Sequence, residues 1–557
     1  MIKIGIARPI LLTLGAIVLS ACGGGGSSGS SAASAAALAA VLAASQVPAP
    51  APAPSTPPAS GPAVPPPPNA KDTCAKLNGA SAGGATSLAT SLVPATATAP
   101  TYCKVSGVLL PKLNFEIRVP DSWNSKLYYQ GGGGFDGSVP GLNALSIQAL
   151  SSGYIGVFSD SGHQAGTLDA TWALNDPYAA ELWGSLSVPT VMSTAVEVIK
   201  LAYGQVPTKS YYEGSSNGGR EGMMAMRRNP NLFDGVIVRS PAYNIVGFFG
   251  HWNSNNKALS APGATLSNAK VATLAKAVRD RCDALDGIQD GIVSNQAACN
   301  IAFDIASLRC ANGADTGDSC LSDAQLAAVA TVTSPASFGS GQTTFRDAAR
   351  PLTGNEDDPG AWPAWITGNG NVRTTISFAL TDSAIKSFVA RDLSVDSLTY
   401  TPYDQDLNSL YAFSTLSDAT SPDLRPFINS GGKVIFWHGG NDAAFPIQST
   451  ADYYEGVVNV LGGKPLADSS VRFYTAPGVN HTTGGPGADT SDLLAAIDAW
   501  VVEGRAPGNL LASKLNANGS IDFQRPLCQY PQYPRYTGPA NDAQAAKAAA
   551  SYVCASP

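Results

Sequence analysis

The pentapeptide Gly214-Ser215-Ser216-Asn217-Gly218 has the G-x-S-x-G spacing of a serine held on a sharp turn between a strand and a helix. Tyr211 and Tyr212 before it predict a strand, and the methionine-bearing run up to Arg228 predicts a helix. Small flanking residues allow the strand and the helix to approach closely, and the helix N-terminus stabilises a developing oxyanion. The pattern indicates that Ser216 is a nucleophile. In a chain with 57 glycines, a plain Ser/Gly loop is the alternative.

A serine nucleophile needs a general base, and the base needs a carboxylate that orients it. The chain has four histidines, and His481 follows a predicted strand in the run APGVNH. Asp442 follows another predicted strand in HGGND. The order serine, aspartate, histidine is the order of an α/β-hydrolase. We therefore predict Ser216, Asp442 and His481 as nucleophile, acid and base, with Asp452 and Asp489 as weaker alternatives for the acid.

Acyl transfer also needs backbone N–H groups that bind the developing oxyanion. The amide of Asn217, directly after the nucleophile, is one predicted donor. The second is predicted in the run Gln130-Gly131-Gly132-Gly133-Gly134, which follows an early strand, and Gly132 is our choice within it. A flexible glycine turn is the alternative interpretation of this run.

Three aspartates lie at short spacing in the run CDALDGIQDGI, which begins at Cys282. Carboxylates and backbone carbonyls in such a loop suit a hard cation. The spacing is not that of an EF-hand, which also needs a terminal glutamate. From composition alone, a solvated acidic loop is the simpler interpretation.

Composition sets the class of the chain and excludes some partners. The 557 residues are 44% hydrophobic and 13% charged, with a net charge of −7 and no cluster of lysine and arginine. This composition predicts a globular protein and argues against a nucleic-acid partner. Residues 1–21 have the charged, apolar and small-residue regions of an export signal. We predict lipidation of Cys22 at its end, with an ordinary signal cut near Ala21 as the alternative.

The rest of the chain divides by composition and pattern. Residues 22–71 are rich in Gly, Ser, Ala and Pro, which predicts a linker. Strand and helix patterns alternate over 72–241 and resume over 422–557, which predicts one α/β catalytic domain. The stretch 242–421 is irregular in pattern, and we expect a lid domain that is inserted over the C-terminal edge of the sheet.

Eight cysteines follow Cys22, and an even number in an exported chain argues for disulfides. Eight cysteines allow roughly 105 pairings. Their occurrence as close couples favours four disulfides, namely Cys74–Cys103, Cys282–Cys299, Cys310–Cys320 and Cys528–Cys554.

Taken together, the elbow, QGGGG, CDALDGIQDGI, HGGNDAAF, PGVNH and RPLC resemble the tannase/feruloyl esterase family, from about Cys74 to Cys554. The resemblance implies an α/β-hydrolase core with an inserted lid and hydrolysis of small aromatic esters through an acyl-enzyme, without an organic cofactor. It assigns the same triad and oxyanion donors. It also implies a structural Ca²⁺ in the lid, bound by the carboxylates of Asp283, Asp286 and Asp290 and the carbonyls of Ile288 and Ile292.

The resemblance is less specific for the substrate. It places Trp365, Arg373 and Phe378 as candidate substrate contacts, with an exposed lid arginine as the alternative for Arg373. We expect esters of hydroxycinnamic or gallic type, with a terephthalate half-ester as the alternative substrate and a non-catalytic surface binding protein as an alternative of another class. The protein is expected to be secreted or held by its lipid at the bacterial outer membrane or periplasmic face, with no other membrane contact.

The sequence departs from the family at one pair of positions. The family usually has a cysteine directly before the nucleophile and another directly after the base, joined by a disulfide. Here these positions hold Ser215 and Thr482. We expect the site to work without this bond, with looser coupling between the two loops.

Overall fold

The computed structural model describes residues 68–340, 343–540 and 542–557. The predicted export signal, Cys22 and nearly all of the predicted linker lie outside the described residues. The first described helix, α2 (Ala70–Leu77), begins close to the expected start of folded structure at residue 72. The Asn69 side chain caps it by accepting a hydrogen bond from the Asp72 amide at 2.9 Å.

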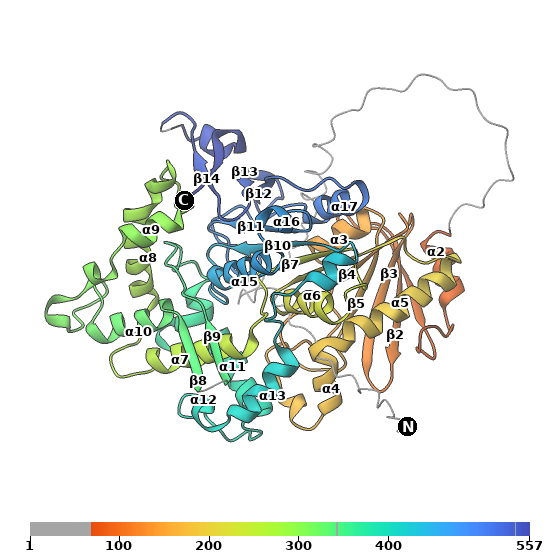
Figure 1. Cartoon of the computed structure of the whole chain (residues 1–557), viewed down its shortest axis with the longest axis horizontal. Coiled ribbons are helices and arrows are strands. Elements are labelled where there is room, and N and C mark those ends of the chain that lie inside the picture. Colours follow the sequence, from red (N-terminus) through yellow and green to blue (C-terminus); the bar gives the residue numbers. More distant parts are fainter. Residues whose placement is uncertain (1–67, 341–342, 541) are drawn as a thin grey trace.

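A nine-stranded sheet forms the centre of the molecule (Figure 1). Its first three strands and β5 pair antiparallel, whereas β5, β4, β6, β7, β10 and β11 run parallel. Parallel strands bring their C-terminal ends to one edge, and the predicted nucleophile, acid and base follow β6, β10 and β11 at that edge. In spatial order the strands are β1 (Ala89–Val93), β2 (Tyr102–Leu109), β3 (Leu113–Pro120), β5 (Ile155–Ser159), β4 (Lys126–Gln130), β6 (Lys209–Ser215), β7 (Gly235–Arg239), β10 (Lys433–Gly439) and β11 (Val471–Ala476).

Helices cover both faces of the sheet, which explains why strands such as β7 are buried along their whole length. Adjacent residues of β6 show the two faces: Tyr212 belongs to one buried cluster and Tyr211 to the other. The cluster around Tyr212 includes residues of α5 (Ser187–Tyr203), α6 (Asn217–Arg228) and α15 (Ile447–Val460). The cluster around Tyr211 includes residues of α3 (Ala144–Ser151) and α17 (Leu493–Glu503).

One helical run, Pro177–Tyr203, is long and apolar enough to cross a membrane by length and composition. It comprises α4 (Pro177–Glu181), a π-helical turn and α5. In the structure 72% of its apolar window is buried against the rest of the protein, as in a core helix.

The segment between β7 and β10, whose sequence pattern is irregular, is largely helical. Several of its helices are short or, like the one at residues 323–333, bury mainly small and polar side chains, so regular apolar spacing did not indicate them. Figure 1 shows the segment, coloured green to cyan, massed on the side of the sheet away from β2 and β3. It contains α7 (Ile245–Leu259), α8 (Asn268–Cys282), α9 (Gln296–Ala302), α10 (Asp323–Thr333), the hairpin β8 (Ala336–Ser340) and β9 (Thr343–Asp347), α11 (Ile376–Ala384), α12 (Pro402–Gln405), α13 (Leu407–Ser417) and α14 (Arg425–Asn429).

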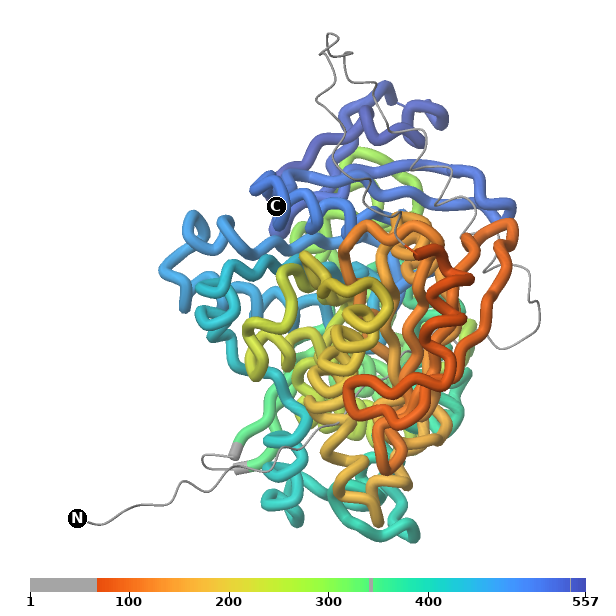
Figure 2. Tube along the Cα trace, turned by 90° about the vertical axis from the view of Figure 1, so that its right-hand side faces the viewer, coloured from red at the N-terminus to blue at the C-terminus, as the bar shows by residue number. Residues whose placement is uncertain are grey.

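The C-terminal tail forms two small antiparallel sheets, shown at the top of Figure 2 in blue. They pair β12 (Leu510–Leu515) with β13 (Ile521–Leu527), and β14 (Tyr533–Tyr536) with β15 (Tyr552–Ala555). A short helix, α16 (Lys464–Ala467), precedes β11. The four expected disulfides are confirmed, and they join Cys74–Cys103, Cys282–Cys299, Cys310–Cys320 and Cys528–Cys554.

Candidate active site

The turn that carries Ser216 joins β6 to α6 and holds the serine in a rare backbone conformation, with φ 60° and ψ −122°. A Cβ atom on Gly214 would collide with the carbonyl of Gly218, and a Cβ atom on Gly218 would lie 2.8 Å from the carbonyl oxygen of Gly132. The Ser216 amide donates to the carbonyl of Arg239 at 2.8 Å, which fastens the turn to β7. Both flanking positions therefore require glycine, as the spacing predicted.

The predicted acid and base form a hydrogen-bonded pair. His481 Nδ1 lies 2.8 Å from Asp442 Oδ2, and the amides of Ala444 and Phe445 donate to Oδ1 at 2.8 and 2.9 Å. Burial raises the pKa of Asp442, but His481 and His438 outweigh it, so the pKa lies below its usual value. Within the described residues, His481 Nε2 is buried and has no hydrogen-bond partner. This nitrogen is the one that accepts the serine proton in a triad.

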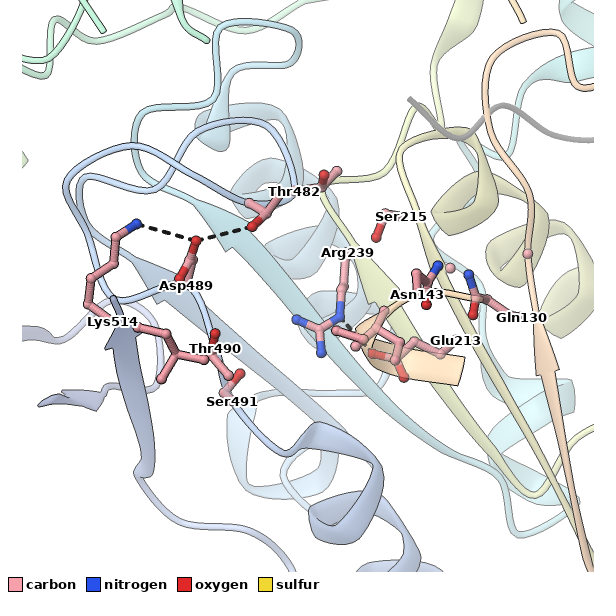
Figure 3. Close-up of a pocket in the computed structure, with 16 residues that line it drawn as sticks. Gln130, Asn143, Glu213, Ser215, Arg239, Thr482, Asp489, Thr490, Ser491 and Lys514 are labelled. Atoms are coloured by element: carbon pink, nitrogen blue, oxygen red, sulfur yellow. Dashed lines mark hydrogen bonds and ion pairs between the residues drawn. The ribbon is translucent and has the colours of Figure 1, made fainter. Parts of the chain in front are cut away.

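The turn of the nucleophile and the turn of the base meet at one pocket. Ser215 and Thr482, the direct neighbours of Ser216 and His481, both line a space of about 300 Å³ (Figure 3). Ser216 itself is buried, with 4% of its surface exposed. The fold thus brings both turns to the same edge of the sheet, and the triad assignment stays a prediction that this arrangement supports.

Two asparagines connect the acid loop to the base loop. Asn441, directly before the acid, donates from Nδ2 to Oδ1 of Asn480, directly before the base, at 2.6 Å. Asn480 Nδ2 donates to Asp358 Oδ1 at 2.6 Å, and Thr353 Oγ1 donates to Asn441 Oδ1 at 2.5 Å. Because Thr353 and Asp358 belong to the inserted segment, that segment fixes both loops.

Two buried side chains, His438 and Arg350, also support the acid; from the sequence, His438 was expected at most to line the site, and Arg350 was not expected there. His438 Nε2 lies 3.1 Å from Asp442 Oδ2, while its Nδ1 lies 2.8 Å from Thr450 Oγ1. Arg350 donates to the backbone carbonyls of Asp442 and Ala444 at 2.6 and 2.9 Å. His438 lies four residues before the acid, which is the one sequence signal that marked it.

The glycine loop after β4 packs on the start of α6, as an oxyanion loop would. As the first residue of α6, Asn217 has an N–H with no acceptor inside the helix. A Cβ atom at Gly132 would lie 2.5 Å from the Asp136 carboxylate, so only glycine fits there. Burial raises the pKa of Glu221 to about 7, although a hydrogen bond from the Gly132 backbone to this carboxyl favours its charged form. The role of Gly132 as an oxyanion donor stays a prediction.

Aromatic rings surround the base. Trp365 and Phe445 present their rings to the His481 imidazole at centroid distances of 5.1 and 5.2 Å. Trp252 packs on both rings, at 5.8 and 5.4 Å. Trp365 was expected here, whereas Phe445, in the loop between β10 and α15, and Trp252, in α7, were not. The site therefore has an apolar aromatic wall next to the proposed base.

Arg373 and Phe378, the other two predicted substrate contacts, lie next to each other. The Arg373 guanidinium lies 5.2 Å from the Phe378 ring, and its Nη2 lies 2.6 Å from Asp396 Oδ2. Half of the Arg373 side chain is exposed. The exposure matches the alternative of an exposed lid arginine, the pairing with Asp396 was not expected, and a contact with substrate stays a prediction.

The aspartate loop offers hard oxygen donors, which suit Ca²⁺. Asp283 accepts from the Gly291 amide at 3.0 Å, and Asp286 accepts from the Ser294 amide at 2.9 Å. Asp290 Oδ2 pairs with Arg525 at 2.6 Å. Burial raises the pKa of Asp283, and it raises that of Asp286 to about 7.

These carboxylates do not converge on one point, because each is turned to the amides of its own loop or to the arginine. In the part of the chain that the structure describes, no group of three or more His, Cys, Asp or Glu side chains is arranged to hold a metal ion. The amides of Ile288 and Ile292 donate to Asp286 and Asp290 at 3.3 and 3.1 Å. The donor types fit Ca²⁺ while this side-chain arrangement does not, so calcium binding stays a prediction.

Comparison with known proteins gives consistent similarities. Residues 96–555 match the family model described as tannase and feruloyl esterase. The chain is 32% identical to a mono(2-hydroxyethyl) terephthalate hydrolase from Piscinibacter sakaiensis, over 82% of this chain and 85% of that protein. It is 30% identical to a probable feruloyl esterase B-1 from Aspergillus fumigatus, over 76% of this chain and 80% of that protein. The crystal structure of feruloyl esterase B from Aspergillus oryzae aligns with a TM-score of 0.73 and 24% identity, over 87% of this chain and 99% of that one.

Proposed function

Because this chain belongs to the tannase and feruloyl esterase family and is a carboxylic ester hydrolase, we propose that it cleaves esters of aromatic acids through an acyl-enzyme on Ser216. The observation that carries the proposal is the His481–Asp442 hydrogen bond of 2.8 Å, together with a strained strand-to-helix turn at Ser216 whose next residue back, Ser215, lines the same pocket as Thr482. In that geometry the imidazole has a fixed orientation and a free Nε2 for the serine proton.

The proposed reaction has two half-reactions on the same residues. His481 takes the proton of the Ser216 hydroxyl as its oxygen attacks the ester carbonyl, and then gives that proton to the departing alcohol. Water repeats the sequence on the acyl-enzyme, which releases the acid and restores the serine. The amide of Asn217, with that of Gly132, donates to the oxyanion in both steps.

An aromatic acyl group is favoured by the ring wall beside the base. Trp365 and Phe445 both lie edge to face with the imidazole, and we propose that their flat apolar surface receives an acyl group on Ser216. We propose hydroxycinnamic or gallic esters as substrates. A terephthalate half-ester is the second candidate, favoured by the 32% identity to a hydrolase of that type.

We propose an exported location for the protein. The four disulfides favour an oxidising compartment. Tethering through a lipid on Cys22 rests on the sequence pattern alone.

A structural Ca²⁺ at the aspartate loop is part of the proposal. The residues that would hold it are Asp283, Asp286 and Asp290, with the carbonyls of Ile288 and Ile292. The cation would neutralise buried carboxylates and so stabilise the loop.

The test is hydrolysis of methyl ferulate, methyl gallate and mono(2-hydroxyethyl) terephthalate by the wild-type protein and by Ser216→Ala. Loss of the nucleophile is expected to lower kcat by about 10⁶-fold at saturating ester. Ser260→Ala, at an exposed helix end, is the matched control and is expected to retain full turnover. Undiminished turnover in Ser216→Ala would exclude the proposed nucleophile, and the relative kcat/KM values select the ester class.

A further inference from the structure

The pocket in Figure 3 lies on the opposite face of the nucleophile turn from α6. Ser215 lines it, and Ser216 does not. Along β6 the side chains alternate, so Glu213 and Ser215 face the same side as Tyr211 and the helices α3 and α17. The space of about 300 Å³ lies between the start of α3, the ends of β6 and β7, the loop 482–491 and the end of β12.

Arg239 is the main polar group of this pocket. Its side chain is 5% exposed, and its Nε donates to Glu213 Oε1 at 2.7 Å. Among the described residues, its two terminal nitrogens have no hydrogen-bond partner, and the guanidinium carbon lies 5.4 Å from the centroid of the Trp437 ring. Figure 3 shows the guanidinium directed across the pocket toward Thr490 and Ser491. A buried arginine with two free N–H groups side by side has the geometry that binds a carboxylate with two parallel hydrogen bonds.

The acidic groups of the pocket already have donors. Glu213 Oε2 accepts from the Tyr128 hydroxyl at 3.1 Å. Asp489 Oδ2 accepts from the Gly484 amide at 2.9 Å and lies 3.4 Å from Lys514 Nζ. The two acids and the two bases that line the pocket cancel in charge. Both carboxylates of the lining therefore have partners already, and neither one pairs with the terminal nitrogens of Arg239.

Further donors face the same space. Ser491 Oγ is buried without a hydrogen-bond partner in the described structure. Ala144 and Leu145 line the pocket and begin α3, and the cap residue Asn143 accepts from the Ser146 amide instead of theirs. The first amides of a helix carry partial positive charge and favour an anion. The lining also has a buried acceptor that lacks a partner within the described residues, Gln130 Oε1, so the donors of Arg239, Ser491 and α3 share the space with it.

We propose that this pocket is a second binding site, separate from the acyl-enzyme site, for a small monocarboxylate with a ring of benzoate size. The carboxylate binds the free edge of Arg239 with help from the Ser491 hydroxyl. The ring lies against Ala144, Leu145 and Leu515, the apolar part of the lining. A volume of about 300 Å³ is at the small end of ligand pockets, which suits one ring and excludes larger acids.

A ligand in this site would contact the turn that carries Ser216 and the turn that carries His481. Ser215 and Thr482 line the pocket, and they are the chain neighbours of the proposed nucleophile and base. A bound acid therefore changes turnover and leaves ester binding unaffected. Under the proposed function, on which only this regulatory part rests, an aromatic acid product is such a ligand, and the site then makes the enzyme responsive to its own product.

The binding test uses sodium benzoate as the probe and benzamide as its neutral counterpart. Phenylmethanesulfonyl fluoride first blocks the proposed nucleophile, so that the probe does not bind in the acyl-enzyme site. Benzoate is expected to raise the unfolding temperature of the blocked protein in a concentration-dependent way, and benzamide is not. Equal shifts with the two probes, or none with benzoate, would overturn the proposal.

Variants locate the binding. Ala144→Trp fills the pocket from its rim and is expected to weaken benzoate binding by roughly tenfold or more, whereas Leu142→Trp, at a 37% exposed neighbour outside the lining, retains it. The double variant Arg239→Gln with Glu213→Gln removes the guanidinium and its paired carboxylate together, so no unpaired charge is left in the pocket. Benzoate is expected not to raise the unfolding temperature of this variant. Unchanged binding in Ala144→Trp would show that benzoate binds elsewhere.

Kinetics separate this proposal from the proposed function. In the unblocked wild-type enzyme, benzoate is expected to change kcat, and this effect disappears in Ala144→Trp. Purely competitive inhibition would overturn the regulatory part. Failure of the sulfonyl fluoride to modify Ser216 would count against the nucleophile instead, and the pocket variants would still report on the carboxylate site.

Discussion

The hydrogen bond between Asn441 and Asn480 sets the distance between the acid loop and the base loop, so breaking it should lower turnover. Asn480→Leu keeps the branched shape of the side chain with a modest increase in size, and it removes two hydrogen bonds of 2.6 Å, one to Asn441 and one to the Asp358 carboxylate. A neutral hydrogen bond contributes about 1 kcal/mol and one to a charged group about 2 kcal/mol, so the loss is about 3 kcal/mol at most. It stays below that because Asp358 retains the Gly360 amide at 2.9 Å.

The expected kinetic effect is larger than the stability effect. Neither asparagine is proposed to touch substrate, but a shift of His481 by about 1 Å costs on the order of 10²-fold in rate. We expect Asn480→Leu and Asn441→Leu each to lower kcat by roughly 10- to 100-fold with little change in KM. Because both changes break the same bond, the double variant should lose less than the product of the two factors, by about fivefold for a coupling of about 1 kcal/mol.

The assay is steady-state hydrolysis of a p-nitrophenyl ester across this double-mutant cycle, with circular dichroism to verify the fold. Asn459→Leu, on the exposed side of α15, is the control and is expected to keep wild-type kcat. If the two factors multiply, or if either single variant keeps full kcat, the asparagine pair does not position the base and the reasoning fails.

Four further changes test other parts of the structure. Gly214→Ala should lower kcat by more than about 10²-fold, measured on folded protein, because its Cβ meets the Gly218 carbonyl. His438→Leu should lower kcat by about tenfold through loss of the 3.1 Å contact with the acid, while His438→Gln, which keeps a donor, restores most of it; equal losses would contradict this. Burial raises the pKa of Asp418 from 3.8 to about 6, so the wild-type protein loses stability as pH rises through that window. Between pH 4 and pH 7, the free energy of unfolding of Asp418→Asn, measured in urea, should therefore rise by up to about 3 kcal/mol relative to that of the wild type. Removal of Ca²⁺ with EGTA should lower the unfolding temperature of the wild type and leave that of Asp286→Asn unchanged, and equal responses would argue against the aspartate loop.

The sequence predicted the catalytic turns well because their signals are local. The strand predicted at Tyr211 and Tyr212 and the helix predicted up to Arg228 are present as β6 and α6. The glycines at 214 and 218 are required by contacts within a single turn, so the spacing alone was sufficient to identify that turn. The four disulfides could also be predicted, since each joins cysteines that are close in the chain.

What could not be predicted depends on contacts between distant segments. Asn441 and Asn480 lie 39 residues apart, and nothing in either neighbourhood indicates that their amides meet. In the inserted segment, α10 begins at the polar cap Ser322 and buries only Gln325, Ala328, Val329 and Val332, so apolar periodicity does not mark it. Arg239 reads as the last residue of a buried strand, and only the fold shows that its guanidinium faces an open space.

The anchoring of both catalytic loops by residues 350–358 has a consequence for engineering. One way to change the substrate preference of an enzyme with a large insertion is to replace the whole insertion with another. Here such a graft would also remove the donors of Arg350 and Thr353 and the acceptor of Asp358, and with them the alignment of acid and base. A transplant that keeps this nine-residue stretch of the recipient, and exchanges only what lies before and after it, is the one expected to give an active chimera.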